Sequence, residues 1–398
     1  MVRYYVAPNG SDSNAGTIDS PFASLNKVWS VVAAGDLVYL RGGTYALPVQ
    51  QHLVGKSGTA GNLIKVWAYP GEKPVLTKGP GYTYQHYRGG TYFSGQYVHF
   101  KGIEITGFTQ DQATVFTPFL VMDASHNIFE QLNVHRNGGS FYIQGNSTGN
   151  LVLNSDFHHN HDPLNGGGNA DGMAIAYVAA GTVNTIRGSR AWSNSDDGFD
   201  CWSNDGQVIF ENNWSWSNGY VPDTLVPAGD GDGFKYGLTT LNLPTTVLRT
   251  SSNNLSFKNR SNGYNWNGAR VQMRFHGNVA FANGRNGFNL DNGITHIFNN
   301  NIAYNNVVYQ TCVGDGRLSE RNATGGYLGC VTNWTVPVTD ADFASVSPAG
   351  VDGPRQADGR LPVVNFLRPS ATSRLIDAGI YVGLPFNGVA PEIGAFER

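Results

Sequence analysis

An asparagine that follows an aromatic or small residue recurs through the middle of the chain, and its spacing limits the possible folds more than any other feature. The recurring positions are Asn137, Asn160, Asn194, Asn218, Asn259, Asn283 and Asn305. They are 23, 34, 24, 41, 24 and 22 residues apart, which is a base period of 22–24 with two longer gaps. This period is typical of a solenoid whose coils carry insertions on one side, and it is too short for propeller blades.

A second unit recurs in the same region and consists of an acid or amide, then glycine, then a large apolar residue. Its copies are Asp171-Gly172-Met173, Asp197-Gly198-Phe199, Asp232-Gly233-Phe234, Asn262-Gly263-Tyr264 and Asn286-Gly287-Phe288. The residues that follow these copies are Ala174, Asp200, Lys235, Asn265 and Asn289. Stacking of the copies in register therefore predicts that Lys235 lies beside Asp200.

Short runs of β-forming residues separated by glycine and asparagine turns fill the chain from Leu37 onward. With 51 glycines and only 14% charged residues, the composition also favours turn-rich β structure. We therefore predict an all-β fold, a parallel β-helix, in which coils about 4.8 Å apart align equivalent side chains into ladders. Asparagine ladders are expected at the turns, and five aromatic residues are expected to stack inside the solenoid: Phe157, Trp192, Phe257, Phe281 and Tyr304.

The predicted solenoid is a single domain over residues 1–398, with an N-terminal cap (1–36), coils (37–306) and a C-terminal segment (307–398) that wraps or caps the other end. Ser20-Pro21 predicts the start of one amphipathic capping helix that continues to Gly35. The two longer gaps predict insertions at His161–Asn169 and at Gly219–Gly231. Both flank a dense group of acidic residues, and loops inserted on one side of a solenoid commonly form its binding face.

This acidic group consists of Asp171, Asp196, Asp197 and Asp200. Four carboxylates on adjacent coils repel one another unless a cation neutralises them, and oxygen ligands in irregular geometry favour Ca²⁺ over Mg²⁺. Asp230 and Asp232 make a weaker case, because Gly-Asp-Gly-Asp-Gly is also the sequence of a tight loop. The alternative for any single aspartate is ordinary turn chemistry beside glycine.

Lys235 is either a solvated surface lysine or a functional group that projects outward beside Asp200. As a general base it would need a lowered pKa, which a nearby calcium ion promotes and the acids oppose.

The remaining bulk properties narrow the function further. A net charge of -3 gives no basic surface for nucleic acid, and no run of 18 apolar residues is present to span a membrane. The three cysteines are too few for a disulfide framework. We expect Cys201 to pack inward as an apolar residue, whereas the pairing of Cys312 with Cys330 stays open.

Several motifs together resemble polysaccharide lyase family 9, the pectate lyases and their relatives. They are Tyr5-Val6-Ala7-Pro8-Asn9-Gly10-Ser11-Asp12, Ala170-Asp171-Gly172, Asn194-Ser195-Asp196-Asp197-Gly198-Phe199-Asp200, Gly231-Asp232-Gly233-Phe234-Lys235 and Ala390-Pro391-Glu392-Ile393-Gly394-Ala395-Phe396-Glu397. The resemblance covers nearly the whole length.

The resemblance implies a right-handed parallel β-helix and β-elimination on a uronic-acid polysaccharide, pectate foremost. Calcium would be held by Asp171, Asp196, Asp197 and Asp200, with Lys235 as Brønsted base. It also implies a secreted enzyme whose leader is absent from this chain, and we expect a monomer. Such chemistry is sound, because a cation on the substrate carboxylate stabilises the charge that develops when the α proton leaves.

The chain departs from the family pattern in two places. Ala176 and Tyr177 stand where a basic residue is expected, and Tyr236 follows Lys235 where a small aliphatic residue is usual. Both departures are expected near the sugar-binding face, so the choice between homogalacturonan and rhamnogalacturonan stays open. Two other readings remain: a polygalacturonase-type hydrolase, which needs no calcium and gives saturated products, and a non-catalytic carbohydrate-binding solenoid with structural calcium.

Overall fold

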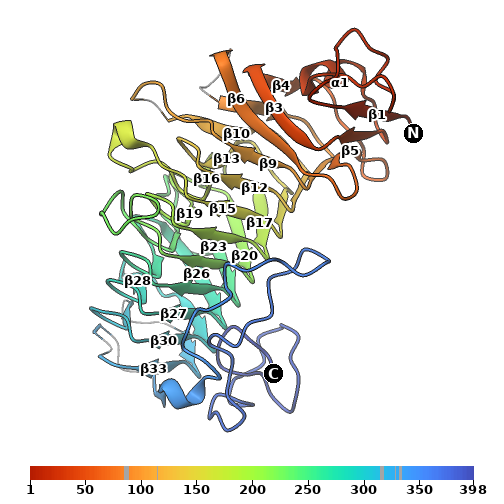
Figure 1. Ribbon diagram of the computed structural model, residues 1–398. Coiled ribbons are helices and arrows are strands. Elements are labelled where there is room, and N and C mark those ends of the chain that lie inside the picture. The colour runs from red at the N-terminus through yellow and green to blue at the C-terminus, as the bar shows by residue number, and fades with distance from the viewer. Residues whose placement is uncertain (85–88, 114, 314–317, 328, 331–333) are drawn as a thin grey trace.

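Three long parallel sheets wind around one axis in the computed structural model, which describes residues 1–84, 89–113, 115–313, 318–327, 329–330 and 334–398 (Figure 1). Except at the two ends, each coil contributes one strand to each sheet, so that neighbours in a sheet come from successive coils. The predicted all-β parallel β-helix is therefore confirmed.

The first sheet has the order β1 (Arg3–Val6), β2 (Leu37–Leu40), β5 (Ile64–Ala68), β8 (Val98–Lys101), β11 (Ile128–Glu130), β14 (Leu151–Leu153), β17 (Val183–Arg187), β20 (Gln207–Glu211), β23 (Asn242–Ser252), β26 (Arg270–His276), β29 (Ile297–Asn299) and β32 (Leu318–Glu320). The second sheet runs through β4 (Gln51–Val54), β7 (Gly89–Ser94), β10 (Thr117–Met122), β13 (Phe141–Gly145), β16 (Met173–Val178), β19 (Phe199–Asp200), β22 (Phe234–Lys235), β25 (Tyr264–Asn265), β28 (Phe288–Leu290) and β31 (Thr311–Val313). The third sheet holds β3 (Gly43–Val49), β6 (Pro74–Thr83), β9 (Glu104–Thr106), β12 (Asn133–His135), β15 (Asp156–His158), β18 (Arg190–Trp192), β21 (Trp214–Trp216), β24 (Leu255–Phe257), β27 (Val279–Phe281), β30 (Ile302–Tyr304), β33 (Ala323–Gly325) and β34 (Val336–Pro337).

The helix α1 (Leu25–Val31) lies at the N-terminal end of the solenoid, as predicted for a cap, but it begins later than Ser20-Pro21 (Figure 1). Phe22 instead forms a β-bridge with Val6, and the hydroxyl of Ser24 accepts the first capping hydrogen bond, from the amide of Lys27. Trp29 packs against Phe93 inside the solenoid, so the apolar face of the helix closes the core. Two short 3₁₀ helices complete the helical structure of the described residues, at Pro163–Asn165 and Asp340–Asp342.

The predicted asparagine ladder lies at the turn between the third and second sheets. The side-chain amide of each member donates to the side-chain oxygen of the next, for example from Asn194 to Asn218 over 3.0 Å. The last member is Asn306 rather than the predicted Asn305, because Asn283 donates to Asn306. Asn305 has φ of 59° and occupies the left-handed position that precedes each ladder asparagine, as Ala282 and Lys258 do one and two coils earlier.

A second ladder, which was not predicted from the sequence, lies at the turn between the first and third sheets. It runs through Asn213, Asn254, Asn278, Asn301 and Asn322, again with side-chain amide to side-chain oxygen contacts. Buried amides of this kind are stable only when both donor and acceptor are satisfied, which stacking in register provides.

The prediction that five aromatic residues stack inside is wrong for four of them. Phe157 lies inside the solenoid, where its strand partner is Ala191. Trp192 instead aligns with the outward His158 and continues the stack on the outer face of the third sheet, which ends with Phe257, Phe281 and Tyr304. This outer stack is not left in water, because the C-terminal segment packs over it and forms a second hydrophobic cluster.

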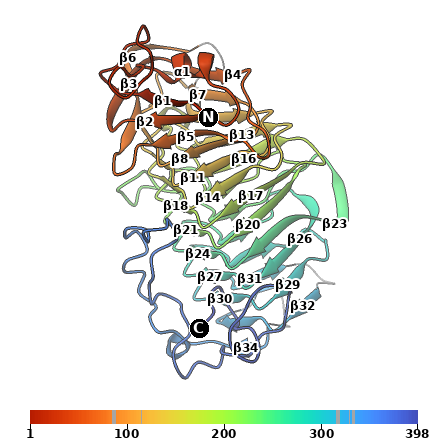
Figure 2. The same ribbon diagram turned by 90° about the vertical axis from the view of Figure 1, so that its right-hand side faces the viewer.

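Parallel pairing continues past residue 306, the expected end of the coils, through β31, β32, β33 and β34. Only after these strands does the chain turn back along the outer face of the third sheet, beside β21, β24 and β27 (Figure 2). Among the described residues, no helix has the length and apolar character needed to cross a membrane.

Candidate functional site

The acid-glycine-apolar units lie where the chain enters the second sheet, and their first residue has a structural task. Asp171 Oδ1 accepts a hydrogen bond from the amide of Asp197 over 3.2 Å, and Asp197 Oδ1 accepts one from the amide of Asp232 over 2.6 Å. Asp232 Oδ1 in turn accepts the amide of Asn262. A side chain at this position therefore secures the next coil.

The glycine in each unit allows this close stacking. A β-carbon on Gly198 would lie 2.0 Å from the hydroxyl oxygen of Ser215 and 2.6 Å from the carbonyl oxygen of Gly233. The apolar residue that follows points into the core, where the rings of Phe199 and Phe234 stack with centroids 5.0 Å apart.

The residue after the apolar one points outward, and its register is the predicted one. Asp200 pairs with Ala174 on one side and with Lys235 on the other, and Lys235 pairs with Asn265. Strand pairing thus places a lysine and an aspartate side by side on adjacent coils of the second sheet.

The predicted acids come together in two overlapping groups. Asp171, Asp197 and Asp200 each offer an oxygen, and these three atoms lie within 4.8 Å of one another. Asp196 belongs instead to a second group with Asp197 and Asp230, again within 4.8 Å. Asp197 is common to both, so all four predicted residues lie in one acid cluster.

Asp230 and Asp232, the two weaker candidates, differ in their surroundings. Asp230 reaches the cluster, and its Oδ2 lies 2.9 Å from Nζ of Lys235. Asp232 turns toward the following coil, where Asn262 and Asn265 donate side-chain amides to its two carboxylate oxygens. Asp232 is therefore satisfied by neutral donors, whereas Asp230 shares a cation with the cluster.

Lys235 is the cation at the centre of this arrangement. Its Nζ lies 2.8 Å from Oδ2 of Asp197 as well as 2.9 Å from Asp230, and 5.8 Å from the ring centroid of Trp202. Lys235 is thus an ion-paired residue and not the solvated surface lysine of the alternative interpretation.

The cluster was expected on an exterior face, but its side chains are buried. Asp197 is completely inaccessible and Asp200 and Lys235 are only 7% and 5% exposed. The reason is that the two insertions meet beside the cluster: Ser195 donates to the carbonyl of Gly167 in the first, and the amide of Asp230 in the second donates to Asp196.

Burial and the neighbouring charges shift the pKa values of the four predicted aspartates and of Lys235. Removal from water, reinforced by neighbouring carboxylates, raises the pKa of Asp171 and of Asp200 to about 7 and that of Asp196 to about 8. Burial opposes the charge on Lys235, but the surrounding aspartates outweigh it and raise its pKa well above the usual range. Without another cation, the lysine is therefore fully protonated.

The donor set fits a hard divalent cation. Oδ1 of Asp200 is buried and accepts no hydrogen bond from any residue that the structure describes. Buried carboxylate oxygens require a partner, and three carboxylates at this separation offer the oxygen-only, irregular environment that suits calcium. Ser140 orients one of them by donating from its hydroxyl to Oδ2 of Asp171.

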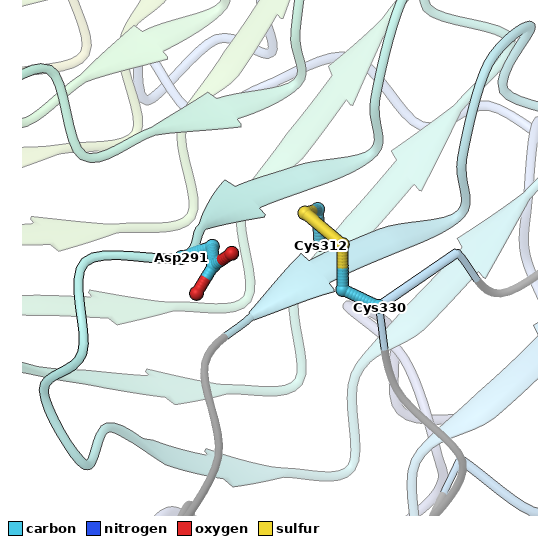
Figure 3. Close-up of side chains that lie close together, drawn as sticks. All are labelled: Asp291, Cys312 and Cys330. Carbon is cyan, nitrogen blue, oxygen red and sulfur yellow. A yellow bond between two sulfur atoms is a disulfide. The ribbon is translucent and has the colours of Figure 1, made fainter.

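A third group of potential ligands, Asp291, Cys312 and Cys330, lies elsewhere on the second sheet (Figure 3). The two cysteines form a disulfide, so their sulfurs are not thiolate ligands and the group is not a metal site. Cys201 packs inside the core as predicted, where burial raises the pKa of its thiol to about 12.

The residues at the two departures from the family pattern lie in different surroundings. Tyr236 lies entirely within the core and donates its hydroxyl to Ser251, so the expectation that it lies near the sugar-binding face is wrong. Ala176 is buried as well, whereas Tyr177 is 56% exposed, and its amide donates to the carbonyl of Trp202 on the next coil.

Residues 4–314 match the family described as Pel9A-like, right-handed beta helix region. The chain belongs to this family. Because the family is described by a right-handed β-helix, the solenoid of this chain is right-handed. The predicted right-handed parallel β-helix and the predicted membership of polysaccharide lyase family 9 are confirmed.

Relatives with curated names agree with this assignment. Pectate lyase L of Dickeya chrysanthemi is 33% identical over 410 residues, which cover 99% of this chain and 90% of the relative. Pectate lyase PEL9 of Emericella nidulans is 31% identical and covers 92% of each chain.

Two solved structures extend the similarity to the whole fold. The crystal structure of pectate lyase Pel9A superimposes with a TM-score of 0.81 at 30% identity, covering 100% of this chain and 96% of that one. A structure titled rhamnogalacturonan lyase gives 0.77 at 29% identity, over 93% and 97%. This Pel9A-like chain is a polysaccharide lyase.

Proposed function

We propose that this chain is a secreted, monomeric, calcium-dependent lyase that cleaves a uronic-acid polysaccharide, pectate foremost, by β-elimination. The observation that carries the proposal is the contact of Lys235 with a buried group of aspartates that lacks a matching positive charge. Among the residues that the structure describes, the ammonium of Lys235 faces the buried Asp171, Asp196, Asp197 and Asp200 and the exposed Asp230, an excess of carboxylates that a divalent cation would offset.

Asp171, Asp197 and Asp200 would hold the calcium ion, with Asp196 at the edge of the same cluster. Bound calcium would neutralise these carboxylates and would act as a Lewis acid on the carboxylate of the substrate. The aspartates that it neutralises are the groups that raise the pKa of Lys235, so the lysine loses the main cause of its protonation.

The task of Lys235 is to accept the proton on the carbon next to the substrate carboxylate. The electron pair of that C–H bond then forms a carbon–carbon double bond, the glycosidic C–O bond on the next carbon breaks, and the leaving oxygen takes a proton from water. Asp197 and Asp230 position Nζ for this step through contacts of 2.8 and 2.9 Å.

Removal of Lys235 tests the mechanism. We expect Lys235→Ala to lower kcat about a hundred- to ten-thousandfold, the usual contribution of a general base. Lys235→Arg should fail equally, because a guanidinium keeps the charge and the donors but stays protonated and cannot accept a proton. The readout is ultraviolet absorbance of unsaturated products from polygalacturonate, with and without chelator, against the exposed Lys73→Ala as a matched control.

The results separate the proposal from its rivals. If Lys235→Arg keeps a large fraction of the activity, the lysine binds substrate and is not the base. Saturated products formed in chelator would instead indicate a hydrolase, and binding without any cleavage would indicate a carbohydrate-binding solenoid.

Rhamnogalacturonan is the second candidate substrate, since the relative titled rhamnogalacturonan lyase is nearly as similar in structure as pectate lyase Pel9A. The same assay with rhamnogalacturonan in place of polygalacturonate decides between them.

A further inference from the structure

Two exposed aromatic residues lie on adjacent coils of the second sheet, and one of them, Trp202, lies beside Lys235 of the acid cluster. Tyr177 is 56% exposed and lies near the end of β16, and Trp202 is 39% exposed and follows β19 by two residues. The amide of Tyr177 donates to the carbonyl of Trp202 over 3.0 Å, which fixes the two residues side by side. β16 and β19 are neighbours in the middle of the solenoid (Figure 1).

A backbone irregularity holds Tyr177 outward. Between β13 and β16, Ile143 pairs with Ile175 and Gly145 pairs with Val178, so that Ala176 and Tyr177 together oppose a single residue. This is the two-against-one pattern of a β-bulge, and bulges often redirect a side chain next to a functional site.

The bulge places the ring outside at a conformational cost. Tyr177 has φ of 55°, a left-handed conformation that bulky residues rarely adopt, while Ala176 and Val178 on either side are buried. Strain of this kind persists only where the surrounding structure imposes it, and it concentrates at binding sites.

The aromatic pair is also continuous with the reacting groups. Nζ of Lys235 lies 5.8 Å from the ring centroid of Trp202, and Trp202 follows Asp200 by two residues, in the turn where β19 has ended. In one of its two directions, a sugar chain whose reacting unit lies at Lys235 would therefore pass over these two rings.

We propose that Tyr177 and Trp202 form a stacking subsite for a pyranose ring of the polysaccharide, adjacent to the ring from which Lys235 takes the proton. The inference rests on the proposed function, since it places the reacting sugar at Lys235. The face of a pyranose ring carries C–H groups, and large aromatic surfaces with polar rims bind such faces while excluding water.

The test compares loss of a ring with retention of one. Trp202→Ala and Tyr177→Ala should each raise KM for the polymer roughly tenfold, as expected for loss of one ring contact. Trp202→Phe and Tyr177→Phe should each raise KM less than the matching alanine variant does, because a smaller or less polar ring remains. The rise in KM of the two alanine variants should be smaller for the shortest oligosaccharide that is still cleaved, because so short a substrate need not reach the subsite.

Tyr381→Ala is the matched control, because Tyr381 is an aromatic residue that is 70% exposed on the C-terminal segment. Calcium affinity by calorimetry and the thermal midpoint should be unchanged in all five variants, which excludes a folding or metal defect. Unchanged KM for the polymer in both alanine variants would overturn the subsite.

A binding measurement keeps the subsite separate from the proposed function. If the unchanged protein binds oligouronides but forms no unsaturated product, the lyase mechanism fails, and weaker binding by the two alanine variants still supports the subsite. If both alanine variants bind as tightly as the unchanged protein, or if the unchanged protein neither binds nor cleaves, the subsite is refuted.

Discussion

The first residue of the acid-glycine-apolar unit secures the next coil, and in the copies at Asp171 and Asp197 it also carries a charge. Comparison of these copies with the later ones separates the two roles. In the later coils Asn262 takes the same position and accepts the amide of Asn286, so a neutral side chain is sufficient to secure the turn. Turn chemistry alone therefore does not explain why the earlier copies at Asp171 and Asp197 carry a charge. Their second oxygens meet Ser140 and Lys235, on the side of the acid cluster.

Asp200 does not stabilise a turn, so replacing one of its carboxylate oxygens by an amide nitrogen tests whether it is a metal ligand. Asp200→Asn should weaken calcium binding at least tenfold, because a charged ligand is lost. It should also raise the free energy of unfolding of the calcium-free protein by about 1–3 kcal/mol, because a buried carboxylate with an unsatisfied oxygen is replaced by a neutral group. Calorimetric titration and chemical denaturation in chelator measure the two effects.

Asp205→Ala provides the control. Asp205 accepts hydrogen bonds from Thr240 and Leu241 in an exposed turn outside the cluster. Its removal should lower stability by about 1 kcal/mol and leave calcium affinity unchanged. Equal calcium affinity in Asp200→Asn and the unchanged protein would remove Asp200 from the ligand set.

From the sequence, Asp200 and Lys235 were predicted to lie side by side, whereas Asp230 was only a weaker candidate. Asp200 and Lys235 follow from copies of one motif, so register alone brings them together. Asp230 lies in an insertion without periodicity, and only the path of that loop returns it to within 2.9 Å of Lys235. Burial was mispredicted for the same reason, since insertions have no spacing from which their position over the sheet follows.

Among the elements, the insertion at 219–231 matters most for the site. Its tip carries Asp223, which pairs with Arg136 at 3.1 Å and with His159 at 3.2 Å on earlier coils. Its end is held by Arg260, which donates to the carbonyl of Asp230 over 2.9 Å. The loop is therefore anchored at its tip and again at Asp230, the residue that contacts Lys235.

Asp223→Ala should reduce activity through the position of the loop rather than through stability. The ion pair of Asp223 with Arg136 is largely solvent-exposed, whereas burial lowers the pKa of His159, so that at neutral pH His159 is a neutral hydrogen-bond partner. Loss of the two contacts should therefore cost only about 1 kcal/mol of unfolding free energy. We expect kcat/KM to fall several-fold, because Asp230 is held less firmly against Lys235. Steady-state kinetics and thermal unfolding of the same samples measure the two quantities.

Asp358→Ala removes a comparable exposed ion pair with Arg360 on the C-terminal segment and should leave kcat/KM unchanged. An equal loss of activity in both variants would show that the anchor at Asp223 has no specific role.

Periodicity also explains which elements could be predicted. The coils were found because asparagine ladders need one polar residue at each turn. The start of α1 was misplaced because Ser20-Pro21 is as good a capping signal as Ser24, and only the bridge between Phe22 and Val6 decides between them. The outer aromatic stack was predicted to lie inside because large aromatic residues are usually buried. The C-terminal segment that buries them from outside has no repeat from which its position could be predicted.

At the scale of the whole molecule, the C-terminal segment holds the later coils together by packing along the third sheet (Figure 2). A buried ion cluster fastens its far end. Asp156 on β15 binds Arg190 on β18 and Arg355 on the segment, each at 2.7 Å, and Arg190 also donates to the carbonyls of Val351 and Gly353.

The charge state of Asp156 gives this contact a pH dependence. Burial alone would raise the pKa of Asp156, but hydrogen bonds and charge from Arg190 and Arg355 lower it below the usual value. A carboxyl whose pKa is lower in the folded protein contributes stability above its unfolded pKa of about 3.9, and this contribution is lost as the pH falls through the folded pKa. The segment should therefore be fastened at neutral pH and released only in strong acid.

Asp156→Asn removes the one acid that both arginines share and leaves two buried cations uncompensated. We expect the free energy of unfolding at pH 7 to fall by about 3–5 kcal/mol and the C-terminal segment to become open to proteolysis before the coils do. The difference from the unchanged protein should begin to shrink below about pH 4, where the carboxyl of the unfolded chain takes up a proton, and it should disappear once the pH falls below the lowered pKa of folded Asp156. Arg355→Gln should cost less, because Asp156 keeps its pair with Arg190. Denaturation across pH and mass spectrometry of the first cleavage products measure these outcomes, and first cleavage in the coils of Asp156→Asn would show that the ion cluster does not fasten the segment.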